Sequence, residues 1–557
     1  MIEYLREAAA QFTNPVLVFG DDGEKFGSWP QTKKHVYEDR WLRDFLDLLL
    51  ANRDWIHVTT PAEVIDTVPP AGRCYLPDAS YREMTEWVLP PETQREFVSL
   101  TRQHPDNAEW QKLVRFTRGG YWRNFRTRYS ESHEMYARMI GISNRLARLA
   151  ASEDSDPQRR DLLQAARTHL HRGQCNCSYW HGAFGGLYLP HLRNAVYAEL
   201  IRADNLLEQS VRGDSAWVDV EVGDLNMDAR PEVRLSNQKL SATFAPACGG
   251  HMYELDLRTN AVNLLATLNR RPEPYHQRIL DYVANAGNVS GEELASISRD
   301  VRFRQPDLDR RIQYDHWPRK SFVDHFLRPR LTLPEFRRNE GVIGDFAVGE
   351  WEAGVRKGER RILLELERAG QAGGLSGRVR KTVAISADRP SELLVQYELT
   401  GFPAGMPLHF AVELNFAAMP GGAADRYFYD DQGTRIGTLD TVQDLQSAER
   451  LSLVDEWLGL DVSLESSVKT GFWAYPLETI SQSEDGFEAI HQSVCVIPHW
   501  EFLMPESGRW VVELRLVPDT AMALARQLAE SARRRRDELG TESAVSVSSG
   551  FPGRGTS

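Results

Sequence analysis

The sequence predicts a multidomain protein in which an α/β region, an all-α region and an all-β region follow one another. Its 557 residues exceed the length of one ordinary domain. Apolar residues keep helical spacing through much of the first 210 residues, whereas short apolar or alternating runs dominate from about residue 216. We expect four segments: 1–80, 81–210, 216–517 and 518–557.

The composition excludes several classes of protein. Hydrophobic residues make up 41% and charged residues 26%, an ordinary globular balance. The formal net charge of −13 argues against a nucleic-acid or anionic-membrane partner. No stretch approaches the roughly 18 to 20 apolar residues of a membrane-spanning helix, and Met1–Glu7 lacks the apolar core of a secretory signal. Five cysteines make no disulfide framework, so we expect a cytoplasmic protein.

The first segment, 1–80, has the pattern of a parallel βαβ element. Apolar spacing predicts helices over 2–12 and 37–52, and buried apolar runs predict strands over 15–19 and 55–59. Two strands alone leave unpaired edges and an uncovered apolar face. We therefore expect this segment to belong to a larger domain.

The second segment, 81–210, predicts a helical bundle. Apolar residues recur at helical spacing over four stretches, and Pro157 stands where a helix begins after a polar loop. The expected helices are 92–102, 135–151, 157–171 and 191–201.

The third segment, 216–517, predicts an all-β sandwich, because Gly, Pro, Asp and Asn clusters separate many short strands and no helical period is sustained. After Pro518 we expect one helix, 521–539, and a disordered tail, 541–557. Representative strands are 242–244, 362–365, 393–398, 410–414 and 510–516.

The loop Asp21–Pro30 is the first candidate site. It reads Asp-Asp-Gly-Glu-Lys-Phe-Gly-Ser-Trp-Pro and follows a predicted buried strand. A carboxyl group among others retains its proton to higher pH, which suits a general acid. The alternative is an Asp-Gly turn with solvated charges. A calcium loop of the EF-hand type is excluded, because the alternating ligands and the distal Glu are absent.

The stretch Gly173–Tyr188 is the second candidate, with His171, Cys175, Cys177 and His181 as conceivable zinc ligands. Cys-x-Cys departs from the spacing of closed zinc sites, so we expect no metal and no cofactor. The remaining interpretation is a polar, aromatic, glycine-rich turn that approaches a ligand. Taken singly, tryptophans here are either core residues or platforms for sugar rings.

These two stretches resemble the fourth and fifth sequence motifs of glycoside hydrolase family 57, in its α-amylase/4-α-glucanotransferase branch. The second contributes Gln-Cys-Asn-x-x-Tyr-Trp-His-Gly-x-Phe-Gly-Gly-Leu-Tyr over 174–188. Three further segments agree: 76–84, 119–125 and 270–276. The resemblance extends from near residue 1 to about residue 517.

The resemblance implies a fold and a set of site residues. It implies that 1–80 is the C-terminal part, or remnant, of a (β/α) barrel and that 216–517 is a large galactose-mutarotase-like β-sandwich of the carbohydrate-binding type. Asp22 falls on the family's acid/base residue. We expect the substrate, an α-glucan or maltooligosaccharide, to contact Glu24, Trp29, Trp180 and His181. Cys177 departs from the pattern, since many relatives carry Asp there.

The His-Gln-Pro motif and the nucleophilic Glu of the family have no counterpart before Asp22. A retaining glycosidase needs both an acid and a nucleophile. We therefore expect the C-terminal portion of a retaining α-glucan-active enzyme, inactive alone and completed by a half-barrel that is lost or separately encoded. The alternative is a standalone, non-catalytic carbohydrate-binding protein. Whether the chain is itself an enzyme, and whether the parent activity is hydrolysis or glucan transfer, stays open.

Overall fold

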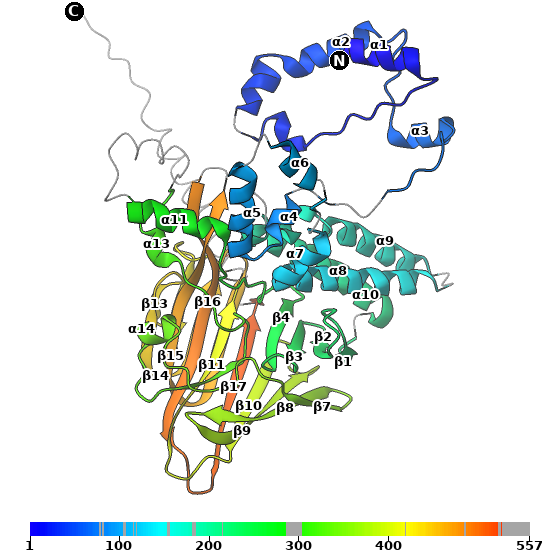
Figure 1. Ribbon diagram of the computed structural model, residues 1–557. Helices are drawn as coiled ribbons and strands as arrows, with labels where there is room; N and C mark the ends of the chain where they lie inside the picture. The colour runs from blue at the N-terminus through cyan, green and yellow to red at the C-terminus, as the bar shows by residue number, and fades with distance from the viewer. Residues whose placement is uncertain are drawn as a thin grey trace, which may run out of the picture. The chain divides into compact units, whose positions relative to one another are not determined.

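The computed structural model describes residues 1–521, 525 and 528, except for 30, 77–79, 81–82, 104–106, 115, 118–119, 153–155, 181–184, 214, 286–302, 418 and 484–485. The chain divides into two compact units, Met1–Ala79 (unit 1) and Ser80–Ser557 (unit 2). Figure 1 labels the helices and strands of the two units.

Unit 1 is helical over its described residues. Its α-helices are α1 (Ile2–Gln11), α2 (Trp41–Ala51) and α3 (Pro61–Thr67), with shorter turns η1 (Gly23–Phe26) and η2 (Lys34–Glu38). The helices predicted over 2–12 and 37–52 are confirmed by α1 and by α2 with η2. The strands predicted over 15–19 and 55–59 are wrong: these residues form no ladder. A strand requires hydrogen bonds to a neighbouring strand, and these two segments do not pair with each other.

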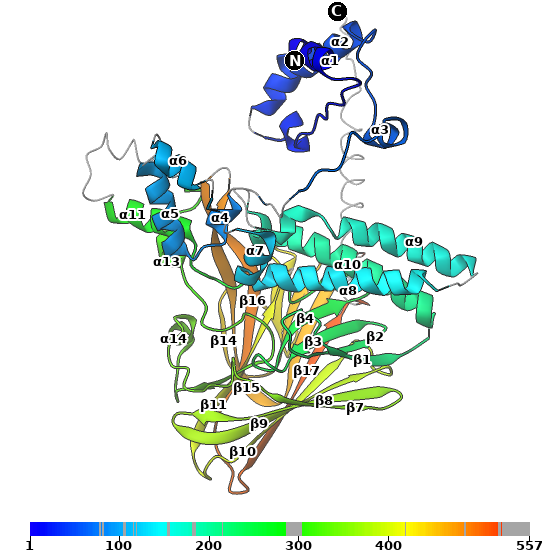
Figure 2. The same cartoon turned by 45° about the vertical axis from the view of Figure 1, so that its right-hand side comes forward.

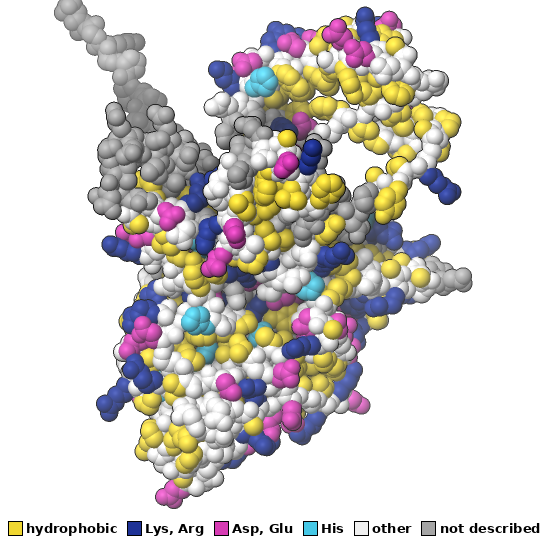
Figure 3. Space-filling model, in the orientation of Figure 1, with side chains coloured by type: hydrophobic (Ala, Val, Ile, Leu, Met, Phe, Trp, Pro, Cys, Tyr) yellow, Lys and Arg dark blue, Asp and Glu magenta, His cyan; other side chains and the backbone are white. Residues whose placement is uncertain are grey.

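Unit 1 buries little of its apolar surface. Its helices α1, α2 and α3 contain no buried residue, and Val36 lies in η2 as a buried exception. In the segment Val16–Phe19 the side chain of Val18 is 83% exposed and that of Phe19 is 63% exposed. Hydrophobic side chains are visible along much of this unit (Figure 3). Packing of this kind provides little of the hydrophobic stabilisation that holds a domain together.

Unit 2 begins with a helical region. The helices α8, α9 and α10 lie side by side in both views of the fold (Figures 1 and 2). The helices predicted over 92–102, 135–151, 157–171 and 191–201 are confirmed by α5, α8, α9 and α10. Within the described residues no helix is both long enough and apolar enough to cross a bilayer. The elements are α4 (Met84–Trp87), α5 (Pro91–Gln103), α6 (Ala108–Val114), α7 (Trp122–Arg128), α8 (Ser130–Ala150), α9 (Pro157–Arg172), η3 (Asn176–Tyr179), η4 (Gly186–Tyr188) and α10 (Pro190–Arg212).

The local sequence explains where α9 begins. The side chain of Asp156 accepts a hydrogen bond from the backbone N–H of Gln158 at 3.0 Å, and Pro157 occupies the first helical position. An Asp cap satisfies an N–H that has no partner in the helix, and proline has no N–H to satisfy.

Two antiparallel sheets follow the helices in unit 2. The first has five strands in sequence order: β1 (Val218–Gly223), β2 (Glu232–Asn237), β3 (Leu240–Ala245), β4 (His251–Leu257) and β5 (Val262–Asn263). The second has twelve strands along the path β13-β12-β14-β15-β17-β10-β9-β8-β7, with β11 and β16 paired beside it and β6 paired to β11. The twelve are β6 (Val323–Leu327), β7 (Glu352–Lys357), β8 (Arg361–Ala372), β9 (Leu375–Ser386), β10 (Leu393–Thr400), β11 (Pro407–Phe416), β12 (Arg426–Asp430), β13 (Arg435–Thr438), β14 (Gln443–Asp455), β15 (Leu460–Ser483), β16 (Gly486–Leu503) and β17 (Arg509–Asp519).

One hydrophobic core joins the two sheets. Leu235 and Leu255 of the five-stranded sheet belong to the same buried cluster as Val383 and Val395 of the twelve-stranded sheet. Alternation explains the inward faces: along β10 every second residue from Leu393 to Leu399 is fully buried. The strands predicted over 242–244, 362–365, 393–398, 410–414 and 510–516 are confirmed within β3, β8, β10, β11 and β17.

The strand region also contains helices that the sequence analysis did not expect. They are α11 (Pro274–Asn285), α13 (Leu308–Arg311) and α14 (Leu333–Arg337). The helix α11 is amphipathic and packs Tyr275 and Ile279 against Ile480 of β15. The helix α11 has 12 residues and stands among many short strands, so its period is easily overlooked in the sequence. The predicted helix 521–539 and tail 541–557 lie almost wholly outside the described residues.

A buried network of charges connects the helices to the five-stranded sheet. Arg138 of α8 lies 3.2 Å from Asp204 of α10 and 3.1 Å from Asp256 of β4. Arg258, just after β4, lies 3.0 Å from the same Asp204 oxygen. Burial raises the pKa of Asp204, but Arg138 and Arg258 outweigh it and hold that pKa well below its usual value.

Two histidines of the twelve-stranded sheet contact each other: His409 is buried and His499 is half-buried. A hydrogen bond of 3.0 Å joins Nδ1 of His499 in β16 and Nε2 of His409 in β11. The centroid of the His499 ring lies 4.1 Å from that of Trp473. Burial, together with His409, lowers the pKa of His499 to about 3. The ring is therefore neutral at pH 7.

We predict that Val16–Phe19 exchanges its amide hydrogens far faster than Leu393–Thr400 of β10. The first segment lacks a ladder and is exposed, whereas β10 is paired on both sides with β9 and β17. Protection should differ by at least about a thousandfold. Hydrogen exchange followed by mass spectrometry measures both segments in one sample. Equal protection would show that unit 1 has a well-packed core.

We predict that His499→Gln reduces the acid sensitivity of unit 2. Below pH 6.5 the unfolded chain takes up a proton that the folded His499, with a pKa of about 3, does not. The free energy of unfolding therefore falls as the pH decreases, by about 1.4 kcal/mol per pH unit for this group. Between pH 7 and pH 5 the variant should lose about 2 kcal/mol less than the parent in denaturant titrations. An unchanged pH dependence would contradict the assignment.

Candidate functional site

In the loop Asp21–Trp29 of unit 1, the two neighbouring aspartates have different surroundings. Lys25 Nζ donates a hydrogen bond to Asp21 Oδ1 at 2.5 Å, whereas it lies 3.8 Å from Asp22 Oδ2. The hydrogen bond from Lys25 lowers the pKa of Asp21, and the backbone N–H of Asp22 adds to the effect. Asp21 is therefore held as a carboxylate. Asp22, with a side chain 62% exposed, is the less constrained of the two.

The turn η1 gives this loop its shape. Asp22 stands at the position before η1, and the carbonyl of Glu24 accepts hydrogen bonds from the N–H groups of Ser28 and Trp29 at 2.9 and 3.0 Å. Gly27 has φ +123°, a conformation that side-chain-bearing residues rarely adopt. Lys25 Nζ lies 5.6 Å from the centre of a Trp29 ring, which places an aromatic face next to the carboxylates.

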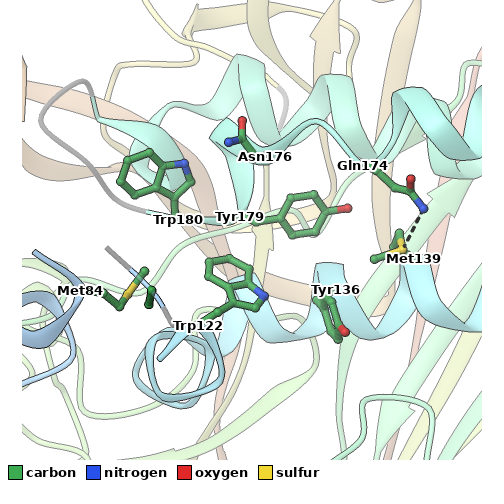
Figure 4. A pocket seen from close by; sticks show the side chains of 9 residues that line it. Met84, Trp122, Tyr136, Met139, Gln174, Asn176, Tyr179 and Trp180 are labelled. Carbon is green, nitrogen blue, oxygen red and sulfur yellow. Dashed lines mark hydrogen bonds between the residues drawn. The ribbon is translucent and has the colours of Figure 1, made fainter. Parts of the chain in front are cut away.

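An aromatic pocket lies in the helical region of unit 2. The cavity measures about 350 Å³. Figure 4 shows the indole rings of Trp122 and Trp180 and the ring of Tyr179 around the pocket, with Met84 at one side. Amide groups of Gln174 and Asn176 add polar atoms to the wall. The lining residues are Ser80, Met84, Trp122, Tyr136, Met139, Gln174, Asn176, Tyr179 and Trp180.

Helix geometry explains how these residues meet. Tyr136 and Met139 are three positions apart on α8 and so share one face of that helix. Trp122 is the first residue of α7. Gln174 Nε2 donates to Met139 Sδ at 3.7 Å, which ties the segment after α9 to α8.

The backbone of Trp180 lies close to Gly186 and Leu187. The N–H of Leu187 donates to the carbonyl of Trp180 at 2.7 Å. Gly186 has φ +46°, and a Cβ at that position would lie 2.0 Å from the Trp180 oxygen. Only glycine permits this approach. On its other side, the ring of Trp180 packs 5.2 Å from that of Trp87.

The predicted site residues have different outcomes. Trp180 lines the aromatic pocket, and its contact with substrate stays a prediction. His181 lies outside the described residues. Asp22, Glu24 and Trp29 share one loop of unit 1. The lining residues Trp122, Tyr136 and Met139 were not predicted from the sequence, although Trp122 lies in the noted segment 119–125.

One group of carboxylates in the described residues has the spacing of metal ligands. Across the described residues, the ligand atoms that gather are those of Asp224, Asp228 and Glu232, all within 4.8 Å of one another; Cys175 and Cys177 are not among them. Backbone N–H groups of the same loop already occupy these carboxylates: Asp228 and Ala229 donate to Asp224. The carboxylates therefore serve to fix the turn between β1 and β2.

Comparison with known proteins assigns the chain to a family. The domain description "Glycosyl hydrolase family 57" matches residues 1–77. "Alpha-amylase/4-alpha-glucanotransferase, middle domain" matches residues 120–207, and "Alpha-amylase/4-alpha-glucanotransferase, C-terminal" matches residues 224–514.

Individual relatives agree. A 4-alpha-glucanotransferase of Thermococcus kodakarensis is 32% identical over 515 residues, covering 92% of this chain and 70% of that protein. An alpha-amylase 1 of Dictyoglomus thermophilum is 31% identical over 525 residues, covering 92% and 71%. The crystal structure of 4-alpha-glucanotransferase from Thermococcus litoralis superposes with a TM-score of 0.67 at 29% identity, covering 93% of this chain and 69% of that one.

The combined matches are those of a glycoside hydrolase. The chain belongs to glycoside hydrolase family 57, and the matching domains are those of its α-amylase/4-α-glucanotransferase branch. The relatives carry the names of enzymes and align with nine-tenths of the chain. They give no support to an inactive fragment, to a non-catalytic binding protein or to a separately encoded half-barrel.

Proposed function

We propose that the protein acts on α-glucans and maltooligosaccharides, with Asp22 as the acid/base residue. The observation that carries the proposal is the contrast between the two aspartates: Lys25 bonds Asp21 and lowers its pKa, while Asp22 is left available to move a proton. A general acid must be protonated before it donates, so the paired Asp21 is poorly suited to the task.

Substrate contacts are proposed for each unit by itself. In unit 1 they are Glu24 and Trp29, which share the loop with Asp22. In unit 2 they are Trp180 and His181, to which we now add Trp122. Indole rings offer flat apolar faces for the C–H faces of glucose rings, and the amides of Gln174 and Asn176 can exchange hydrogen bonds with hydroxyls.

A retaining mechanism divides the reaction between two carboxyl groups. Asp22 would protonate the departing glycosidic oxygen and later deprotonate the water or acceptor hydroxyl. The second carboxylate would attack the anomeric carbon. Among the carboxyls beside Asp22, Glu24 is the first to test for that role.

The finer domain assignment is part of the same proposal. Unit 1 would be the C-terminal part of a (β/α) barrel, and the two sheets that share one core would form a mutarotase-like β-sandwich of the carbohydrate-binding type. The family match over 1–77 and the common core of the sheets support these assignments.

We predict that Asp22→Asn lowers the turnover of maltooligosaccharides by at least about a hundredfold, because an amide cannot transfer the proton. Asp21→Asn, the matched control, should lower it by less than about tenfold. Product release from labelled maltoheptaose measures both variants. Turnover that does not depend on Asp22 would refute its role as the acid/base residue.

We predict that Trp122→Ala and Trp180→Ala each weaken maltoheptaose binding by about tenfold, since each removes an aromatic face worth roughly 1 kcal/mol or more. Trp457→Ala is the matched control: this tryptophan is 71% exposed in the turn between β14 and β15. Titration calorimetry gives the dissociation constants. Equal affinities in all three variants would remove the pocket from the binding site.

A further inference from the structure

Glu273 is a buried residue that does not line the aromatic pocket. It accepts hydrogen bonds from side chains that connect it to residues of that pocket. The residue precedes α11 and is 3% exposed. Its Oε1 accepts hydrogen bonds from the hydroxyls of Tyr129 at 2.7 Å and Tyr188 at 2.8 Å. Its Oε2 accepts one from Arg128 Nη2 at 3.0 Å. Each of these donors is connected, by further hydrogen bonds or ring contacts, to Trp122 or Trp180 of the pocket.

The first connection runs through Arg128 to Trp180. Arg128 Nη1 donates to the carbonyl of Trp87 at 2.6 Å and to that of Leu89 at 2.7 Å. The ring of Trp87 then packs 5.2 Å from the ring of Trp180. The Glu273 carboxylate orients the guanidinium, and the guanidinium fixes the end of α4 that carries Trp87.

The second connection runs through Tyr129 to Trp122. The ring of Tyr129 stacks on Phe125 with centroids 4.5 Å apart, and Phe125 stacks on Trp122 at 5.6 Å. All three rings belong to α7 or to the residue that follows it. A shift of the Tyr129 hydroxyl would therefore move the stack that ends in the pocket.

The third connection runs through Tyr188 to the backbone of Trp180. Tyr188 ends η4, and its neighbour Leu187 donates to the Trp180 carbonyl at 2.7 Å. Burial raises the pKa of Tyr129 and that of Tyr188 well above the ordinary value, so both phenols remain protonated donors.

We propose that Glu273 is a positioning residue that holds Trp122 and Trp180 in the arrangement that receives a glucose ring. The inference rests on the proposed function for the identity of the ligand. Glu273 is not among the residues that line the pocket. It acts through its hydrogen bonds with Arg128, Tyr129 and Tyr188. A single carboxylate thereby positions both Trp122 and Trp180.

The test is Glu273→Gln in the full chain, with maltoheptaose as the probe. The amide keeps the shape of the side chain but loses the charge that binds Arg128. We expect the dissociation constant to rise about tenfold, because small displacements of positioning groups are costly. We also expect a change in the circular-dichroism band that arises from the closely spaced indoles of Trp87 and Trp180, in the absence of sugar.

Two controls separate positioning from folding. Glu413→Gln removes a buried carboxylate that lies 2.9 Å from Arg319 in the twelve-stranded sheet; it should lower stability and leave both maltoheptaose binding and the indole band unchanged. Tyr188→Phe deletes one hydrogen bond at nearly constant volume. If Glu273→Gln does not fold, a weaker effect of Tyr188→Phe on the same two measurements supports the proposal, and no effect overturns it.

The outcomes also separate this proposal from the proposed function. If the parent protein does not bind maltoheptaose, the proposed function fails, and the indole band still decides whether Glu273 positions the tryptophans. If the parent binds and Glu273→Gln shows the parent's affinity and the parent's indole band, the positioning role is overturned and the proposed function stands.

Discussion

The buried charges around Arg138 are the constraint on which the arrangement of unit 2 depends. The guanidinium of this α8 residue meets carboxylates of α10 and β4 where water is excluded. Burial of an ion is costly, so such a group tolerates only the geometry that keeps every charge paired. The network thus fixes the helices against the five-stranded sheet. Because that sheet shares its core with the twelve-stranded sheet, the pocket on α7 and α8 has a rigid support.

Local patterns in the sequence were sufficient where the fold is local. Helical spacing predicted α5, α8, α9 and α10, and alternation predicted β10 and β17, because side chains three or two positions apart share a face. The strand prediction for the apolar run at 15–19 was wrong because a strand is not a local feature. Apolarity predicts burial, but a ladder needs a second strand that the run itself cannot encode.

The residues of the candidate site also differ in how far the sequence could predict them. The motif drew attention to Trp180, which lines the aromatic pocket, and Trp122 of the same pocket lay in a segment that had already been noted. Glu273 also lay in a noted segment, 270–276, but its partners could not be foreseen, since its bond to Arg128 spans 145 positions in the chain. No periodicity connects residues at that separation. Only the fold brings the carboxylate, the guanidinium and the two phenols together.

The exposed segment Val16–Phe19 has a consequence for the behaviour of the protein at high concentration. An extended, apolar stretch whose backbone is not part of a ladder can pair with the same stretch of another molecule. The net charge of −13 opposes such encounters through mutual repulsion. Salt screens that repulsion while leaving apolar attraction intact. Concentrated stocks should therefore be more prone to self-association in strong salt than in dilute buffer.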